Sequence, residues 1–269
     1  MPLALVKLLL TPFFIGGMSL VARRWGPAVA GFLVALPLTS GPVVVFVALE
    51  HGVPFGEEVG LAVLTGGFGL CAYAIAYVRA SAVAGPFASG TIATAAFVIA
   101  GLIVNVLDPV SLPLVVLGVA IAMAIAIATV PAAPEVGRGG RVPPWDLPAR
   151  VLVGTALIVG LTTLAPTLGA RLSGLAATYP VYVTTLTVFA HRQAGSAAAG
   201  ALLRGLVLGL YGWLGFFTVV LIAMPRIGVL PAAACAVAGA LAIQAVSLRL
   251  LGGSITAGLR EAVVGETVP

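Results

Sequence analysis

Two short stretches of proline and hydroxyl-bearing residues interrupt apolar sequence, and their side chains are the best placed to do chemistry. A proline inside a helix removes a backbone hydrogen bond and clashes with the preceding turn. The carbonyl and amide groups that it frees need partners when they are buried away from water, and hydroxyls or a bound ligand can supply them. The two stretches consist of Pro37, Thr39, Ser40 and Pro42, and of Tyr179, Pro180, Tyr182, Thr184 and Thr185.

Two interpretations of these stretches are open. In the first, they line a substrate pathway. In the second, they are proline kinks whose freed backbone groups bond to serine and threonine on neighbouring turns. Pro37 and Pro180 lie 143 residues apart, which is the spacing of an internal repeat, and this recurrence favours the first interpretation.

The sequence contains no cluster of residues typical of an enzyme or a metal centre. His51 and His191 are expected at opposite faces of a membrane, so we interpret each as an interfacial polar residue. The segment 134–140 is rich in glycine but lacks the Gly-Lys-Ser/Thr ending of a phosphate loop. No carboxylate lies in the middle of an apolar run, which argues against proton coupling and a cationic substrate. We expect no enzymatic activity, no metal and no cofactor.

The composition indicates a membrane protein. Hydrophobic residues make up 61% of the 269 residues, charged residues make up 8%, and the mean hydropathy is +1.21. Soluble domains carry about 25% charged residues, so this chain has too few polar side chains to cover a water-exposed surface. The net charge of +5 comes from scattered residues, which excludes a nucleic-acid interface and leaves membrane lipids as the expected surroundings.

We expect an all-α polytopic protein with about nine transmembrane helices. A crossing helix needs about 20 mostly apolar residues. By this criterion the spans are 4–22, 27–49, 59–78, 83–106, 111–130, 150–168, 171–190, 198–224 and 227–251. A longer hydrophilic segment, rich in proline and glycine, runs from Pro131 to Leu147 and is interpreted as a linker.

An internal repeat with an offset of 143 residues divides the chain into two units. The matching pairs include Gly31 and Gly174, Pro37 and Pro180, Phe46 and Phe189, Gly52 and Gly195, Gly66 and Gly209, and Gly69 and Gly212. The predicted units are 1–107 and 149–252, each with four spans, joined by an extra span and linker over 108–148 and followed by a tail over 253–269. The extra span makes the second unit enter the membrane from the opposite face, which is the inverted-repeat plan of secondary transporters.

The basic residues predict the orientation. With the N-terminus outside and the C-terminus in the cytoplasm, ten arginines lie on the cytoplasmic side, and Lys7, Arg171 and Arg226 lie outside. We therefore expect a multi-pass protein of a bacterial cytoplasmic (inner) membrane. Lys7 and Arg204 lie near span ends, where anchoring to the interface is a better explanation than binding of an anionic head group.

Glycines recur in two of the expected spans. Gly60, Gly66, Gly67 and Gly69 lie in the third span, and Gly205, Gly209, Gly212 and Gly215 lie in the eighth. Small residues one helical turn apart allow helix backbones to approach closely. We expect close helix contact at these glycines in preference to a groove that faces a ligand.

One sequence pattern resembles the GlpM family of short bacterial inner-membrane proteins. It reads Ala-Gly-Phe-Leu-Val-Ala-Leu-Pro-Leu-Thr-Ser over 30–40, followed by Ala-Leu-Glu-His-Gly over 48–52. The resemblance covers about 3–105 and extends more faintly to 150–250, where Leu-Pro-Leu-Thr-Ser is replaced by Tyr-Pro-Val-Tyr-Val. Because members of that family are single four-span units, the resemblance implies a fused version of a dimer of such units. It implies no established activity.

Two functions fit these patterns. The favoured one is a small inverted-repeat secondary transporter or facilitator for a neutral or amphipathic small molecule or a lipid carrier. The alternative is a non-transporting membrane subunit or assembly factor for envelope polysaccharide export. A homodimer is compatible with either function.

Overall fold

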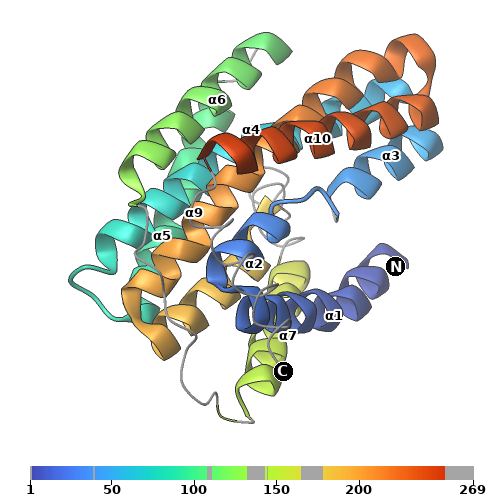
Figure 1. Ribbon diagram of the computed structural model, residues 1–269. Helices are drawn as coiled ribbons and strands as arrows, with labels where there is room; N and C mark the ends of the chain where they lie inside the picture. The colour runs from blue at the N-terminus through green and yellow to red at the C-terminus, as the bar shows by residue number, and fades with distance from the viewer. Residues whose placement is uncertain are drawn as a thin grey trace, which may run out of the picture.

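The computed structural model describes residues 2–38, 40–107, 111–131, 143, 145–164 and 178–251. Within them, all regular secondary structure is helical (Figure 1). Thr39, most of the expected linker and the whole expected tail lie outside the described residues, as does 165–177. The expectation of an all-α protein is confirmed for the described part of the chain.

The helices follow the expected spans closely in four places and differ from them in two. The described helices are α1 (Pro2–Trp25), α2 (Pro27–Val34), α3 (Ser40–His51), α4 (Val53–Ala80), α5 (Pro86–Leu107), α6 (Leu112–Thr129), α7 (Asp146–Leu164), α9 (Val181–Ile227) and α10 (Val229–Leu251). Among them α4, α5, α6, α9 and α10 are long and apolar enough to cross a membrane. The chain is therefore compatible with a membrane protein, while the count of nine spans stays a prediction.

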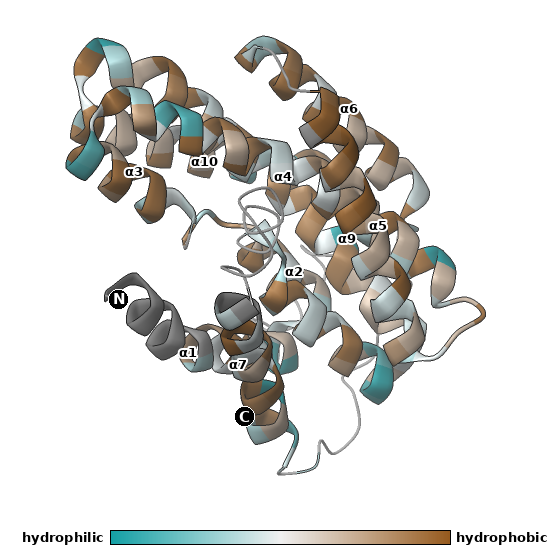
Figure 2. Cartoon of the chain, turned by 180° about the vertical axis from the view of Figure 1, so that it is seen from behind, coloured by the Kyte–Doolittle hydropathy of each residue, from teal (hydrophilic) through white to brown (hydrophobic). Residues whose placement is uncertain are grey.

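The apolar surface fits this description. Large apolar side chains are exposed along α5, α6, α7 and α10, among them Val106, Ile121, Leu152 and Leu250. Figure 2 shows hydrophobic residues over the outward faces of α6 and α10, with hydrophilic residues gathered toward helix ends. A continuous apolar exterior of this kind is unfavourable in water and favourable in lipid.

The second expected span is not one helix but two. Gly26 has φ 91, and Pro27 occupies the first turn of α2, so the preceding helix ends there. After eight residues α2 ends before Pro37, and the Leu36 amide bonds the Leu33 carbonyl at 3.1 Å. The next helix, α3, begins at Ser40 and ends before Gly52, which has φ 94. This break is the effect expected of Pro37.

A second joint lies within α9. The helix is interrupted at Gly195, which has φ 81, so that 181–194 and 196–227 are two segments. These segments correspond to the seventh and eighth expected spans. Gly52 and Gly195 are 143 residues apart, and both adopt a backbone conformation that favours glycine.

The second segment of α9 packs directly against α2. A Cβ atom on Gly31 would overlap the Leu202 carbonyl oxygen, and one on Gly205 would overlap the Ala28 carbonyl oxygen. The two backbones therefore touch without intervening side chains, as small residues permit. The expected close contact at Gly205 is confirmed, and Gly209 lies in the same way against Phe32.

Helices α1 and α7 contact one another in opposite senses along their sequences. Arg23, near the end of α1, bonds Asp146 at the start of α7. Ile15, in the middle of α1, packs against Gly154, which is further along α7. Positions in contact thus descend along α1 as they ascend along α7, so the two helices are antiparallel where they touch.

Candidate functional site

The second proline stretch forms a cluster of hydroxyl groups at the start of α9. Tyr179 and Pro180 are non-helical, and the helix begins at Val181. The Tyr179 hydroxyl lies 2.8 Å from Thr94 Oγ1 on α5 and accepts a hydrogen bond from Thr184 Oγ1 at 3.1 Å. Its ring packs edge-on against Phe97, with centroids 5.6 Å apart. The break therefore brings hydroxyls from two helices together.

Polar side chains continue from this cluster along α9. Thr184, Thr187 and His191 follow at intervals of three and four residues, which place them on one face of a helix. On α4, Tyr73 and Tyr77 are one turn apart, and their rings stack with centroids 6.0 Å apart. The Tyr77 hydroxyl lies 3.3 Å from His191 Nδ1. We call this set the polar ladder: Tyr73, Tyr77, Thr184, Thr187 and His191.

Two hydroxyls of the polar ladder are buried without a hydrogen bond. Tyr73 and Thr187 are each 0% exposed, and neither hydroxyl has a hydrogen-bond partner among the described residues. The Tyr73 hydroxyl lies near Thr184, Tyr179 and Tyr77 without meeting the distance of a bond to any of them. A buried hydroxyl without a partner destabilises a protein by about 1–3 kcal/mol, so these two groups call for an explanation.

Thr185 faces away from the polar ladder. Its side chain is 1% exposed, and its hydroxyl likewise has no hydrogen-bond partner among the described residues. A Cβ atom on Gly154 would lie 3.4 Å from Thr185 Oγ1, so this threonine faces α7. The two neighbouring threonines, Thr184 and Thr185, therefore serve different interfaces.

The first proline stretch has a different environment. Pro37 and Ser40 are partly buried and Pro42 is exposed, while Thr39 lies outside the described residues. Gly41 packs against the ring of Phe216, where a Cβ atom would lie 3.0 Å from the nearest ring carbon. The carbonyl of Phe32, in the last turn of α2, accepts a hydrogen bond at 3.2 Å from Gln244 Nε2 on α10. A distant amide thus satisfies part of the backbone that the break exposes.

Residues equivalent to the polar ladder under the offset of 143 are apolar. Val44, Ala48, Phe216 and Val220 belong to one buried apolar cluster. We call this set the apolar counterpart, and it pairs Phe216 with Tyr73, Val220 with Tyr77, Gly41 with Thr184, Val44 with Thr187 and Ala48 with His191.

A small hollow brings the two proline stretches near each other. It has a volume of about 20 Å³ and is lined by Phe14, Met18, Leu33, Val34, Leu36, Leu38 and Tyr182. Leu36 and Leu38 flank Pro37, so Tyr182 from the second stretch lies beside the first. This volume admits about one water molecule, and the lining is apolar except for Tyr182.

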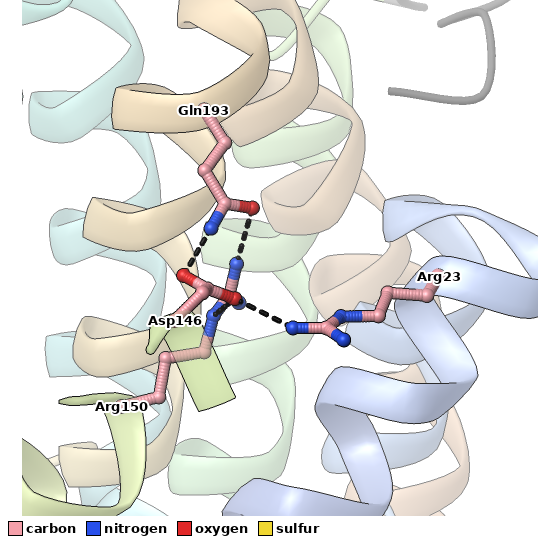
Figure 3. A network of polar contacts seen from close by, with 4 residues as sticks. All are labelled: Arg23, Asp146, Arg150 and Gln193. Atoms are coloured by element: carbon pink, nitrogen blue, oxygen red, sulfur yellow. Dashed lines mark hydrogen bonds and ion pairs between the residues drawn. The ribbon is translucent and has the colours of Figure 1, made fainter. Parts of the chain in front are cut away.

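A buried ionic network joins α1, α7 and the first segment of α9 (Figure 3). Asp146, which is 0% exposed, accepts hydrogen bonds from Arg23 at 2.9 Å and from Arg150 at 3.0 Å. Gln193 donates its amide to the other Asp146 oxygen and accepts a bond from Arg150 at 2.7 Å. The Arg150 guanidinium also lies 5.2 Å from the ring centre of Phe189. Each oxygen of the buried carboxylate therefore has a partner.

The sequence-based interpretation placed two parts of this network incorrectly. Asp146 and Leu147 were expected in the linker, but they form the first turn of α7. The reason is that α1 supplies Arg23 and α9 supplies Gln193, so a carboxylate can be buried at a helix N-terminus, where its charge is also favoured. His191, expected as an interfacial residue, bonds the buried Tyr77.

Arg204 anchors a helix end within the protein. Its guanidinium bonds the carbonyls of Ile127, at 3.1 Å, and of Val130 at the end of α6. Cations at a helix C-terminus satisfy free carbonyls and complement the helix dipole.

The structure brings some of the candidate residues together and separates others. Tyr179 and Thr184 are bonded to each other, Tyr182 lies beside the first break, and Thr185 faces α7. Sequence reasoning missed Tyr73, Tyr77, Thr94 and Gln244, which bond to or surround the breaks. For Tyr73 and Tyr77 a signal was present, since two tyrosines one turn apart are unusual within an apolar span and their equivalents are Phe216 and Val220.

Comparison of the chain with protein-family models, with curated proteins and with solved structures finds no match. Within the described residues, no three His, Cys, Asp or Glu side chains are grouped so that they could hold a metal ion. The function is therefore argued from the geometry of the chain itself.

Proposed function

We propose that this protein is a small inverted-repeat secondary transporter or facilitator for a neutral or amphipathic solute. The observation that carries the proposal is the break between α2 and α3, which interrupts an apolar segment long enough to span a membrane. Interrupted helices that line a site near mid-depth are a feature of such transporters. A purely structural helix gains nothing from a break whose carbonyl must be satisfied by Gln244 of a distant helix.

Contacts that recur under the offset of 143 support two related halves. Gly209 of α9 lies against Ala35 after α2, and Gly66 of α4 lies against Thr178 before α9. Adding 143 to Ala35 gives Thr178, and subtracting 143 from Gly209 gives Gly66. Exchanging the two halves therefore converts one contact into the other, as a two-fold relation requires.

The packing of α1 against α7 supports the inverted orientation. These helices are equivalent under the same offset, and their contacting positions add up to a constant: 23 and 146 give 169, as do 15 and 154. Two equivalent helices that pair antiparallel in this way are related by an axis across their lengths. For helices that span a bilayer, that axis lies in the plane of the membrane.

Labelling of single cysteines tests the inverted arrangement. In a background with Cys71→Ala and Cys235→Ser, one cysteine replaces Arg24 and, in a second variant, another replaces Arg171. The proposal expects a membrane-impermeant thiol reagent to reach the two positions from opposite sides of the bilayer. Labelling from the same side would refute the inverted repeat.

Solute flux tests the transport function. Purified protein in liposomes is offered glycerol, erythritol and glucose, and vesicle swelling is followed by light scattering. Thr39→Val and Thr185→Val each remove one hydroxyl at nearly constant shape, so we expect folded protein with slower flux for the transported solute. Thr218→Val is the matched control, because Thr218 bonds the Leu214 carbonyl of its own helix. Unchanged flux in both variants would contradict the assigned pathway.

The small size of the hollow favours a second candidate. A volume of about 20 Å³ beside Tyr182 holds no solute larger than water, as expected if the breaks are packed shut in a non-transporting membrane subunit or assembly factor. That candidate expects co-purification with a partner membrane protein and no flux of any of the three solutes in liposomes.

A further inference from the structure

The two unpaired hydroxyls of the polar ladder lie between segments that are already hydrogen-bonded. At one end, Tyr179 bonds Thr94 and Thr184 beside the helix break. At the other end, Tyr77 bonds His191, one residue before the exposed Arg192. Tyr73 and Thr187 lie between these ends on facing helices, and each is 0% exposed. The bonded chain is therefore interrupted where the unpaired groups lie.

Bound water accounts for these groups better than empty space does. Buried polar side chains are normally bonded to protein or to ordered water, and a buried water typically makes two to four hydrogen bonds. Tyr73, Thr184 and Thr187 offer hydroxyls that can both donate and accept. Together they supply the partners that such a water requires.

We propose that bound water completes the polar ladder, and that the completed chain carries protons between His191 and the helix break at Tyr179. An imidazolium N–H of His191 passes its proton to the Tyr77 hydroxyl, which releases its own proton to the next oxygen. Water, Tyr73 and Thr184 repeat the exchange as far as Tyr179. Each member gains one proton and loses one, so nothing is oxidised or reduced, and His191 is reprotonated from the solution.

The apolar counterpart makes this path one-sided. Its residues are Gly41, Val44, Ala48, Phe216 and Val220, which supply no hydroxyl or ring nitrogen. A proton that reaches the breaks along the polar ladder therefore has no equivalent route onward through α3. With the orientation predicted from the basic residues, the ladder opens to the cytoplasmic side.

Charged groups surround the His191 end. Arg192 follows on the same helix with its guanidinium 5.8 Å from the ring centre of Trp145, and Arg79 lies near the end of α4. Asp146 and Arg150 of α7 hold Gln193, two residues further along. The charges of Asp146 and Arg150 offset one another, so the two remaining arginines favour a neutral imidazole, which can accept a proton and release it again.

Radiolytic hydroxyl labelling tests for the water itself. Hydroxyl radicals formed from bound water modify the side chains beside it, and mass spectrometry measures the rate at each residue. Tyr73 and Phe217 are both 0% exposed, so Phe217 is the matched dry control. After correction for intrinsic reactivity, we expect Tyr73 to be modified about tenfold faster because it borders water. Modification of Tyr73 at the rate of Phe217 would overturn the proposal.

Proton flux tests conduction. The full-length protein is placed in liposomes with a trapped pH-sensitive dye, and a potassium gradient with valinomycin drives protons inward. We expect acidification faster than in empty liposomes, slowed roughly tenfold by Tyr73→Phe or Thr187→Val, since each removes one member of the chain. Thr218→Val should leave the rate unchanged. A rate equal to that of empty liposomes, or one unaffected by both variants, would contradict conduction.

This inference rests on the proposed function only for the use to which the protons are put. The labelling result depends on water alone, so it can succeed or fail separately from solute flux. Labelled Tyr73 without solute flux would sink the transporter proposal and keep the water chain. Solute flux without labelling of Tyr73 would do the reverse.

Discussion

The two helix breaks occupy equivalent places in the repeat and are stabilised in opposite ways. At the first break, Gly41 lies against Phe216, and Gln244 bonds the freed Phe32 carbonyl. At the second, Tyr179, Thr94 and Thr184 bond one another, and Tyr73 lies nearby without a partner. The same backbone device can thus be closed by apolar packing or kept polar, and the difference depends on a few side chains.

The ionic network belongs to the polar side, and its loss should have the largest effect. Asp146→Ala removes the carboxylate that holds Arg23 and Arg150. Removing one partner of a buried ion pair typically destabilises a protein by about 3–5 kcal/mol. We expect a loss of this size in unfolding by sodium dodecyl sulfate in mixed micelles.

A double variant separates charge from packing in that network. Asp146→Leu combined with Arg150→Met removes both buried charges, and such replacements are often close to neutral. It should therefore be more stable than Asp146→Ala. A double variant as unstable as the single one would show that the buried charges are not the cause.

The next largest effect should come from the packed side of the comparison. Gly205→Ala places a methyl group on the Ala28 carbonyl oxygen, where backbone faces backbone and neither can shift cheaply. Overpacking of this kind costs about 1–3 kcal/mol and occasionally more. Gly200→Ala is the control, because a Cβ atom there would meet nothing within 4 Å. Equal stability of the two variants would place the α2 contact elsewhere.

A hydroxyl added to the apolar counterpart should have a moderate effect. Phe216→Tyr gives this position the side chain of its equivalent, Tyr73, but among Gly41, Val44 and other apolar groups. Burying an unpaired hydroxyl costs about 1–3 kcal/mol. The unfolding midpoint should fall accordingly. No fall in the midpoint would mean that the first break, too, has polar partners to offer.

The reverse exchange should have the smallest effect. Tyr73→Phe removes a buried hydroxyl that has no hydrogen-bond partner among the described residues, so the free energy of unfolding should change by less than about 1 kcal/mol. The same micelle titration compares it with Phe216→Tyr. A loss larger than that of Phe216→Tyr would contradict the distinction between a polar and an apolar side.

Sequence patterns predicted the elements better than their partners. Apolar runs predicted α4, α5, α6 and α10 to within a few residues, except that α4 begins six residues early, because Pro54 can occupy the first turn of a helix. Pro37 and Pro180 predicted the two interruptions correctly, since the effect of proline on a helix is local.

The contacts across the breaks could not be predicted, since they depend on packing between distant segments. Nothing near Gln244 in the sequence indicates that its amide reaches Phe32, 212 residues away. Asp146 looked like a linker residue because its neighbours are hydrophilic, and Arg23 and Gln193 are needed to bury it. The partnering of Thr184 with Tyr179, and of Thr185 with α7, likewise depends on which helix each face meets.

The contact of Gly31 and Gly205 restricts how α2 and α9 can move. Interlocked side chains resist rotation of one helix on another, whereas two backbones that meet at glycines have little to disengage. Pulling them apart would lose the contact, but turning them about it would not. The crossing point therefore acts as a pivot: the helix ends can swing apart by several ångströms while the centre stays still.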